Sequence, residues 1–351
     1  MRTYAVIILA FLGSSVMAFD AKADLLKALN DAKKVGLPTS PSDLNLLAPS
    51  KETIALEKLI DKASLTMRKY EPSFGQVVDI DFENLKRKKN GRPEKPYPEP
   101  TSAQITSRTK ETLSIIEQIG ATTAPRQYKL GSTPVDSFPR SASVKAFVTM
   151  ELDEATTSAK QGDTKEVIRK LKIVRRLIQI VRADDTVVGL LGEQASEQKY
   201  YAALQKMAKN YPLIAKSFAA DLLSPLKKPT IEQILKQEFF RTLSTFALSS
   251  EAARKQPFVE LGSWKLEGGK DSLDFLIAST KSWALAFPEL KSCQSGKELE
   301  DRYKGLKSKL GTYKFKDEEE IELGPSWAEG ARALDKAEAK RLETIKVLGF
   351  G

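Results

Sequence analysis

Apolar residues recur every three to four positions along most of the chain, the spacing of helices that each bury one face. The stretch from Val167 to Val181, VIRKLKIVRRLIQIV, places nine aliphatic residues among five Lys and Arg residues. Ile173 and Ile180 form a second ridge, away from the main apolar arc of Val167, Leu171, Val174, Leu177, Ile178 and Val181. A helix lying on a membrane needs one apolar and one charged face. We therefore expect a helix packed between neighbours, and docking of an anionic partner stays the alternative.

The same periodicity predicts a succession of helices. Ser50 is the expected N-cap of the helix that begins SKETIALEKL, and Gly36 is expected to end the helix before it. Further helices are predicted at about 102–119, 141–160, 164–182, 186–209, 212–223, 229–249, 271–287, 296–309 and 326–348. Only short pieces such as TYKFK alternate like strands. The pattern predicts an all-α fold, a layered antiparallel array of helical hairpins resembling a solenoid, with little or no β-structure.

Composition shifts divide the chain into four parts. Residues 1–18 read as a signal peptide and residues 19–90 as an N-terminal helical segment. The stretch LKRKKNGRPEKPYPEP has four prolines in eight residues, so residues 91–140 are predicted to be a Pro-rich connector that carries one helix, about 102–119. Residues 141–351 would form the main helical domain.

The first residues predict export. Arg2 precedes an apolar run from Tyr4 to Leu12, and small residues lead to an expected cleavage after Ala18. The apolar stretch is shorter than the roughly 20 residues of a spanning helix, so no transmembrane span is expected after signal removal. Cleavage would leave 55 basic and 46 acidic residues, a net charge of +9. We expect a periplasmic or secreted protein with a basic surface that attracts anions.

One turn carries a resemblance. In AKQGDTKEV, Ala159, Gly162 and Asp163 resemble the turn between paired helices of tetratricopeptide-type repeats, although no 34-residue period surrounds it. The stretches from Gln161 to Leu191 and IEQILKQEFFRTL are similar to exported all-helical bacterial proteins. The resemblance implies a helical fold and leaves the function open.

Three carboxylates fall on apolar helix faces. Glu193 and Glu197 lie four residues apart on one face, and Glu238 lies inside a second apolar arc. Buried carboxylates need partners, and the candidates are Lys170, which also falls inside an apolar arc, Arg169 and Arg241. The structural interpretation is an internal network that holds helices in register. The functional one is a cleft where two carboxylates act as acid and base, as in glycoside hydrolysis.

Two groups of basic residues could bind anions. Lys86, Arg87, Lys88, Lys89 and Arg92 are expected in an extended segment, where phosphate attraction would be unspecific and salt-sensitive. Arg169, Arg175 and Arg176 belong to the helix described first. A solvated linker is the plain alternative for the first group.

Several chemistries are excluded. The chain has no His and one Cys, which rules out Ser-His-Asp and Cys-His catalysis and the common zinc sites. Cys293 is expected to be a small, half-buried loop residue. Asp79, Asp81 and Glu83 in DIDFEN lack the Gly and final Glu of a calcium loop and are expected in a solvated turn, and KDEEEIE in a charged loop. No metal site or cofactor is expected.

The leading hypothesis is an exported helical scaffold or binding protein of the cell envelope. Its basic surface would contact an anionic polymer or an acidic protein. An envelope hydrolase acting on glycans through Glu193, Glu197 and Glu238 is the alternative, and nonspecific nucleic-acid binding, which rests on charge alone, is third.

Overall fold

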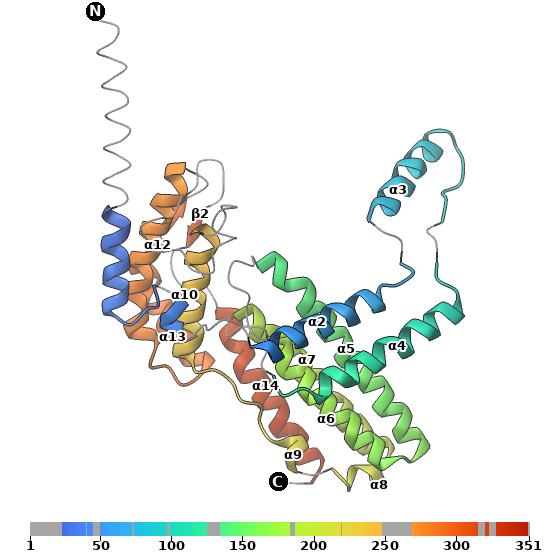
Figure 1. The fold of residues 1–351 in the computed structure, drawn as a ribbon. Helices are drawn as coiled ribbons and strands as arrows, with labels where there is room; N and C mark the ends of the chain where they lie inside the picture. Colours follow the sequence, from blue (N-terminus) through green and yellow to red (C-terminus); the bar gives the residue numbers. More distant parts are fainter. Residues whose placement is uncertain are drawn as a thin grey trace, which may run out of the picture.

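The chain is seen in a computed structural model (Figure 1). The structure describes residues 23–39, 41–44, 50–71, 74–96, 99–124, 134–182, 187–218, 220–247, 269–314, 320–322 and 328–349. The predicted signal peptide and its cleavage point lie outside these residues.

Helices make up almost all of the described secondary structure. They are a helix over 23–34, a 3₁₀ turn η1 (Pro41–Leu44), α2 (Lys51–Met67), α3 (Phe74–Lys89), α4 (Ser102–Ala121), α5 (Pro134–Gln161), α6 (Thr164–Val181), α7 (Val187–Asn210), α8 (Pro212–Ala215), α9 (Ala220–Leu223), α10 (Ile231–Ala247), α12 (Gly269–Leu290), α13 (Gly296–Leu310) and α14 (Ala328–Val347). Two three-residue strands, β1 (Thr312–Lys314) and β2 (Glu320–Glu322), pair antiparallel with Tyr313 opposite Ile321. The prediction of an all-α fold is confirmed, with this short ribbon as the only sheet among the described residues.

Side-chain caps explain where several helices begin. Ser50 Oγ accepts a hydrogen bond from the backbone N–H of Thr53, as predicted for the start of α2. Thr101 and Gln104 form a reciprocal capping box at the start of α4. Ser295 caps α13 by accepting from the N–H of Glu298. Each cap satisfies a backbone donor that the helix itself leaves unpaired.

The structure differs from the predicted helices in several places. Helix α3 was not predicted, and DIDFEN lies within it, so the interpretation of that segment as a turn is wrong. Helix α5 begins at Pro134, inside the predicted connector. The helix predicted over 212–223 is two four-residue helices, α8 and α9, and residues 216–218 belong to neither. The second acidic stretch, KDEEEIE, ends in strand β2.

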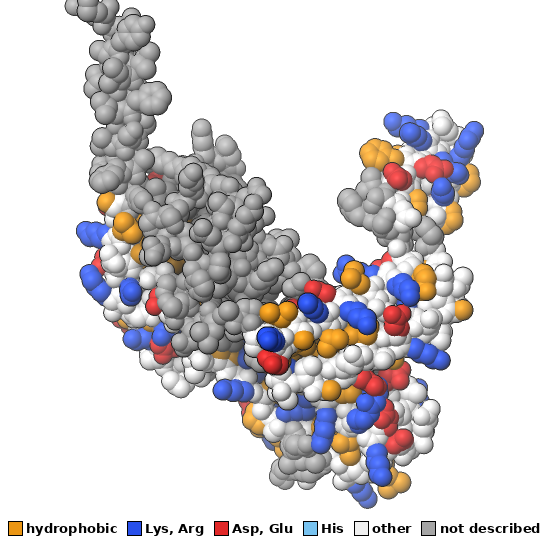
Figure 2. Space-filling model, viewed as in Figure 1, with side chains coloured by type: hydrophobic (Ala, Val, Ile, Leu, Met, Phe, Trp, Pro, Cys, Tyr) orange, Lys and Arg blue, Asp and Glu red, His pale blue; other side chains and the backbone are white. Residues whose placement is uncertain are grey.

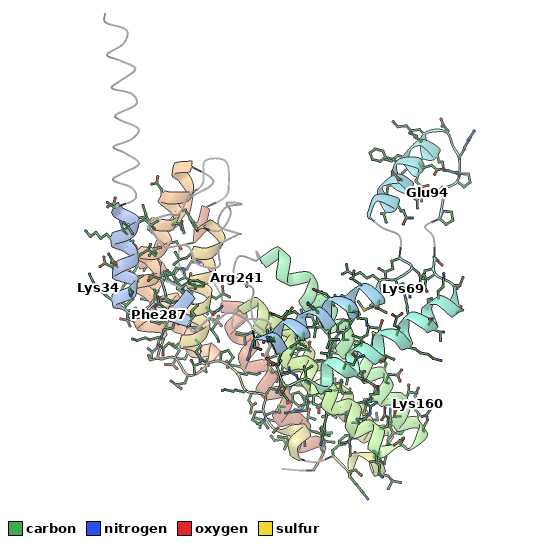
Figure 3. All side chains as sticks on the ribbon, viewed as in Figure 1. Lys34, Lys69, Glu94, Lys160, Arg241 and Phe287 are labelled. Atoms are coloured by element: carbon green, nitrogen blue, oxygen red, sulfur yellow. The ribbon has the colours of Figure 1, made fainter. Side chains whose placement is uncertain are left out.

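The buried apolar side chains form two clusters. The larger cluster is built by α2, α4, α5, α6, α7 and the residues from α8 to Leu226. The smaller cluster joins the helix over 23–34 to α10, α12 and α13, and Figure 3 places Phe287 within it. Helix α14 packs against both α7 and α13, so it connects the two clusters (Figure 1). The helix over 23–34 and α2, which both belong to the predicted N-terminal segment, therefore pack into different clusters.

Helix α6 is buried along both of its apolar ridges. Ile173 is 7% exposed and Ile180 is 1% exposed, so the second apolar ridge is covered as well as the first. Gly120 of α4 explains how the ridge fits, because a Cβ placed there would lie only 2.9 Å from Ile173 Cγ1 and Cγ2. The absence of a side chain at residue 120 lets α4 approach α6 closely. The expectation of a helix packed between neighbours is confirmed.

A tight turn joins α5 to α6 at the segment that resembles a tetratricopeptide turn. The N–H of Asp163 donates to Ser158 O at 3.0 Å and the N–H of Gly162 to Ala159 O at 3.2 Å, a Schellman motif. Gly162 has φ of +78°, in the left-handed region. The side chain of Asp163 then caps α6 by accepting from the N–H of Glu166. One residue thus follows the end of the first helix and begins the second.

Two Gly to Ala substitutions should have opposite effects on the free energy of unfolding. Gly162→Ala is expected to cost about 1–2 kcal/mol, because the left-handed conformation is unfavourable for a residue with a Cβ. Gly305→Ala, inside α13, is expected to stabilise by about 0.5–1 kcal/mol through helix propensity. A Cβ at either position meets no atom within 4 Å, so packing does not confuse the comparison. Urea unfolding followed by circular dichroism measures both, and equal effects would contradict the role of Gly162.

Candidate functional site

Glu193 and Glu197 lie on α7 and are both buried. Their side chains are 1% and 4% exposed. Arg182, which follows α6, places Nη1 2.8 Å from Glu193 Oε2. Lys228, which precedes α10, places Nζ 2.8 Å from Glu197 Oε2. The structure confirms that both carboxylates face inward, but the partners expected from the sequence were wrong.

Burial dominates the electrostatics of Glu193. It raises the pKa of Glu193 to about 7, with Arg182 opposing the shift and Glu197 adding to it. The pKa of Tyr201 is raised to about 12, first by burial and then by the charge of Glu197. Tyr200 and Tyr201 are each 1% exposed and lie edge to face, 5.3 Å between ring centroids. Both tyrosines are therefore part of the core and do not line an open cleft.

Glu238 does not join this pair. It lies on α10, a helix of the smaller cluster, and its side chain is only half-buried between buried Gln237 and Phe239. Glycoside hydrolysis needs two carboxylates that flank a substrate bond. Of the three predicted residues, the structure brings only Glu193 and Glu197 together. Each of these two carboxylates is buried and forms an ion pair with a cation.

A second buried network surrounds Lys170, which is 5% exposed. Lys170 Nζ lies 2.8 Å from Glu117 Oε1, 3.2 Å from Glu151 Oε2 and 4.0 Å from Glu166 Oε1. Burial lowers the pKa of Lys170, but the hydrogen bond to Glu117 and the charge of Glu151 outweigh it, so the pKa is raised. Burial also raises the pKa of Glu151, whose side chain is 0% exposed. This network links α4, α5 and α6.

Sequence reasoning missed Glu151, although a signal was present. Glu151 follows Val144, Phe147 and Val148 by seven, four and three residues, the spacing of one buried helix face. All three apolar residues are 0% exposed. A carboxylate in that register should have been expected inside, opposite a cation.

The three arginines of α6 are engaged within the protein. Arg169 pairs with Glu117 at 2.8 Å and with Glu166 at 2.6 Å. Arg175 donates to Leu222 O at 2.9 Å and to Ser224. Arg176 donates to the carbonyl oxygen of Ala124 and to Thr122 Oγ1, and burial lowers its pKa. Because each of the three guanidinium groups already donates to an acceptor within the protein, we do not place these arginines in an anion-binding surface.

The other predicted basic group forms the end of an arm that stands away from the body (Figure 1). We call residues 74–96, which comprise α3 and the segment that returns beside it, the α3 arm. Lys86, Arg87, Lys88 and Lys89 occupy the last turn of α3, so the expectation of an extended segment is wrong for them. Basic residues are favourable there because the carbonyl end of a helix carries partial negative charge.

The chain reverses at Gly91, which has φ of +63°. The N–H of Arg92 donates to Arg87 O at 2.9 Å and the N–H of Gly91 to Lys88 O at 3.2 Å, a second Schellman motif. A residue with a Cβ would be strained in this conformation. The turn therefore fixes Arg92 beside the lysines of the last helical turn.

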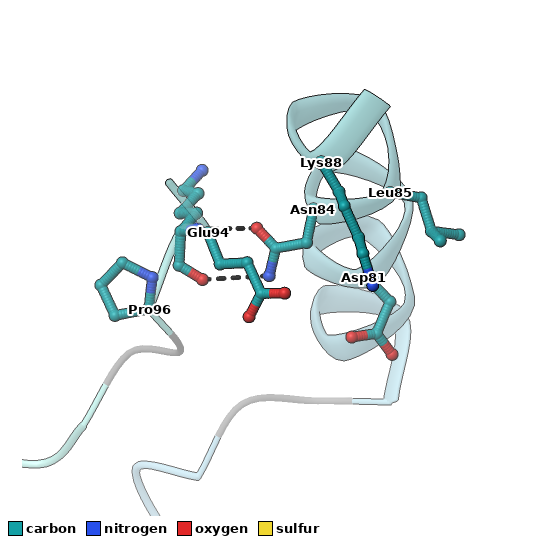
Figure 4. A pocket seen from close by; sticks show the side chains of 7 residues that line it. Asp81, Asn84, Leu85, Lys88, Glu94 and Pro96 are labelled. Atoms are coloured by element: carbon teal, nitrogen blue, oxygen red, sulfur yellow. Dashed lines mark hydrogen bonds between the residues drawn. The ribbon is translucent and has the colours of Figure 1, made fainter. Parts of the chain in front are cut away.

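Polar contacts hold the returning segment against α3 (Figure 4). The side chain of Asn84 accepts from the N–H of Lys95 at 2.6 Å and donates to Lys95 O at 3.1 Å. Glu83 pairs with Arg87 at 2.9 Å and with Lys95 at 3.0 Å. A groove of about 550 Å³ is formed by α3 and the returning segment. It is lined by Asp81, Asn84, Leu85, Lys88, Glu94, Lys95 and Pro96. The arm is thus an ordered unit with a fixed basic end.

Four basic side chains at this end have no acidic partner. Lys86, Lys88, Lys89 and Arg92 are exposed, and none forms an ion pair with a carboxylate among the described residues. On the visible face, Lys and Arg lie among Asp and Glu on both the body and the arm (Figure 2). The unpaired cations make the end of the arm the strongest candidate for an anion-binding surface.

Cys293 and the aspartates of α3 lie apart from the buried carboxylates. Cys293 lies in the turn after α12, but the expectation that it is half-buried is wrong, because it is 4% exposed and burial raises its thiol pKa. Asp79 and Asp81 are exposed on α3. Within the described ranges, no three potential metal ligands converge. Likewise, none of the described helices combines the length and apolarity that crossing a bilayer requires.

Comparison of the chain with protein-family models, curated proteins and solved structures finds no match.

Proposed function

We propose that the protein is an exported helical scaffold or binding protein of the cell envelope, and that the end of its α3 arm contacts an anionic polymer. The observation that carries this proposal is the exposure of Lys86, Lys88, Lys89 and Arg92 without acidic partners. Like charges that crowd one helical turn repel each other, and an anionic partner would relieve that repulsion. Export rests on the residues before Phe19.

The hydrolase alternative has weaker support. A general acid or base must lie within hydrogen-bonding reach of its substrate. Glu193 and Glu197 each form an ion pair through one carboxylate oxygen and are almost fully shielded from solvent. An acidic protein as the partner of the arm would use the same four cations, and nucleic acid would do so without sequence preference.

Retention on anionic beads tests the proposal. The full chain should bind heparin beads and cell-wall beads, with affinity falling roughly 100-fold between about 50 and 200 mM salt if four contacts release counterions. Changing Lys86, Lys88, Lys89 and Arg92 together to Gln should abolish retention at the higher salt. The control changes four other exposed lysines to Gln, Lys206, Lys209, Lys297 and Lys309, and so removes the same charge.

Two outcomes would contradict the proposal. Retention that does not change with salt would exclude an electrostatic contact. Equal losses in the two fourfold variants would show that net charge matters and the arm does not.

A further inference from the structure

One face of α3 combines exposed apolar and basic side chains. Phe82 is 62% and Leu85 is 58% exposed, and Lys86 and Lys89 are exposed beside them. At about 100° per residue these four positions fall within an arc of roughly 100°. No acidic residue falls inside this arc, and the nearest, Asp79 and Asp81, lie just outside its edges and closer to the start of the helix. We call these four residues the exposed face of the arm.

The returning segment covers a different side of α3. Ile80 is 8% exposed, and Glu83, Asn84 and Arg87 make the contacts to residues 93–95 described above. These residues lie roughly opposite the exposed face on the helical wheel. Ile80 is thus covered within the arm, whereas Phe82 and Leu85 stay mostly exposed, although Leu85 also lines the groove. Phe82 and Leu85 are therefore exposed although the arm around them is held by defined contacts.

We infer that the exposed face of the arm also binds an anionic phospholipid bilayer, a step that rests on the proposed function because the same basic end of the arm supplies the cations. Contact with a polymer of charged groups explains the lysines, but it leaves Phe82 and Leu85 in water. A bilayer surface satisfies both kinds of side chain. Phe82 and Leu85 would enter the boundary between headgroups and acyl chains, and Lys86 and Lys89 would extend to the phosphates.

Sedimentation with vesicles tests this inference on the full chain. We expect binding to vesicles of phosphatidylglycerol mixed with phosphatidylcholine, and at least tenfold weaker binding to phosphatidylcholine alone, since each basic residue near an anionic surface contributes roughly fivefold. The double variant Phe82→Ser with Leu85→Ser should weaken vesicle binding about 10- to 100-fold. Its retention on heparin beads should stay unchanged.

A matched control removes exposed apolar side chains elsewhere. Ile54 and Leu65 of α2 are 44% and 73% exposed, so Ile54→Ser with Leu65→Ser should leave vesicle binding unchanged. Circular dichroism checks that each variant keeps its helices. Equal vesicle binding by the wild type and the Phe82/Leu85 variant would overturn the inference, as would equal binding to neutral vesicles.

The two proposals can fail separately. Retention on anionic beads with no binding to vesicles would sink the bilayer inference and leave the proposed function standing. Absence of both in the wild-type protein would sink both.

Discussion

Replacing the buried Lys170 by Met is expected to lower the free energy of unfolding by about 3–5 kcal/mol, the largest effect that we predict for a single substitution. Lys170 is the cation that faces Glu151, and neither carboxylate oxygen of Glu151 receives a well-formed hydrogen bond from a described residue. Met keeps the length of the side chain but removes its charge. Glu117 is 39% exposed, so water can solvate its charge when Lys170 is removed. The loss of stability therefore comes mainly from Glu151, whose charge would be left buried without a cation.

Unfolding in urea at neutral pH measures this effect. The control is Lys165→Met, an exposed position on the same helix, which should change the free energy of unfolding by less than about 0.5 kcal/mol. The double variant Lys170→Met with Glu151→Met should recover most of the loss, because a buried ion pair replaced by apolar side chains is often close to neutral.

The direction of the pH dependence gives a second check. Burial already raises the pKa of Glu151, and removal of Lys170 should raise it further. A carboxyl group whose pKa is higher in the folded state favours folding below its unfolded pKa and loses that contribution as pH rises. The single variant should therefore become less defective towards acid pH. A defect that is small and independent of pH would show that Glu151 is not charged beside Lys170.

The sequence was sufficient to locate most helices because each has one apolar face and recognisable ends. Ser50, Gly162 and Asp163 act at helix boundaries through their own local hydrogen bonds, so their roles can be read without knowing the fold. Helix α3 was missed for the opposite reason. Its basic final turn and its acidic residues resemble a charged loop, and the contacts that stabilise the arm come from residues 93–95, beyond the helix.

The pairing of buried charges could be predicted only in part. That Glu193, Glu197 and Lys170 need partners follows from their places on apolar helix faces. Which partner each finds depends on how helices cross, and Arg182 and Lys228 come from connecting segments whose paths no periodicity specifies. The burial of Glu151 could have been predicted, because Glu151 lies on the same helix face as buried apolar residues of α5. The exposed cations of the arm likewise required knowledge of which basic residues already have acceptors.

Glu193→Gln is expected to remove a large part of the pH dependence of stability. Burial raises the pKa of Glu193 from 4.5 to about 7 in the folded protein. The folded state therefore binds more protons than the unfolded state between these values, and stability falls as pH rises through them. Each pKa unit corresponds to about 1.4 kcal/mol, so Glu193 should cost the wild type about 3 kcal/mol between about pH 4.5 and 7.

Urea unfolding of both proteins between about pH 5 and 8 isolates this contribution, because the other charges that face Glu193, those of Arg182, Glu197 and Lys228, are present in both. The variant should match the wild type at the acid end and exceed it at the alkaline end. Arg182, 17% exposed on its side chain, retains water when its partner becomes neutral. Glu289→Gln, exposed on α12, is the control and should leave the curve unchanged. Parallel curves for wild type and Glu193→Gln would mean that Arg182 fully offsets the burial of the carboxylate, and Glu193 would then stay charged throughout this range.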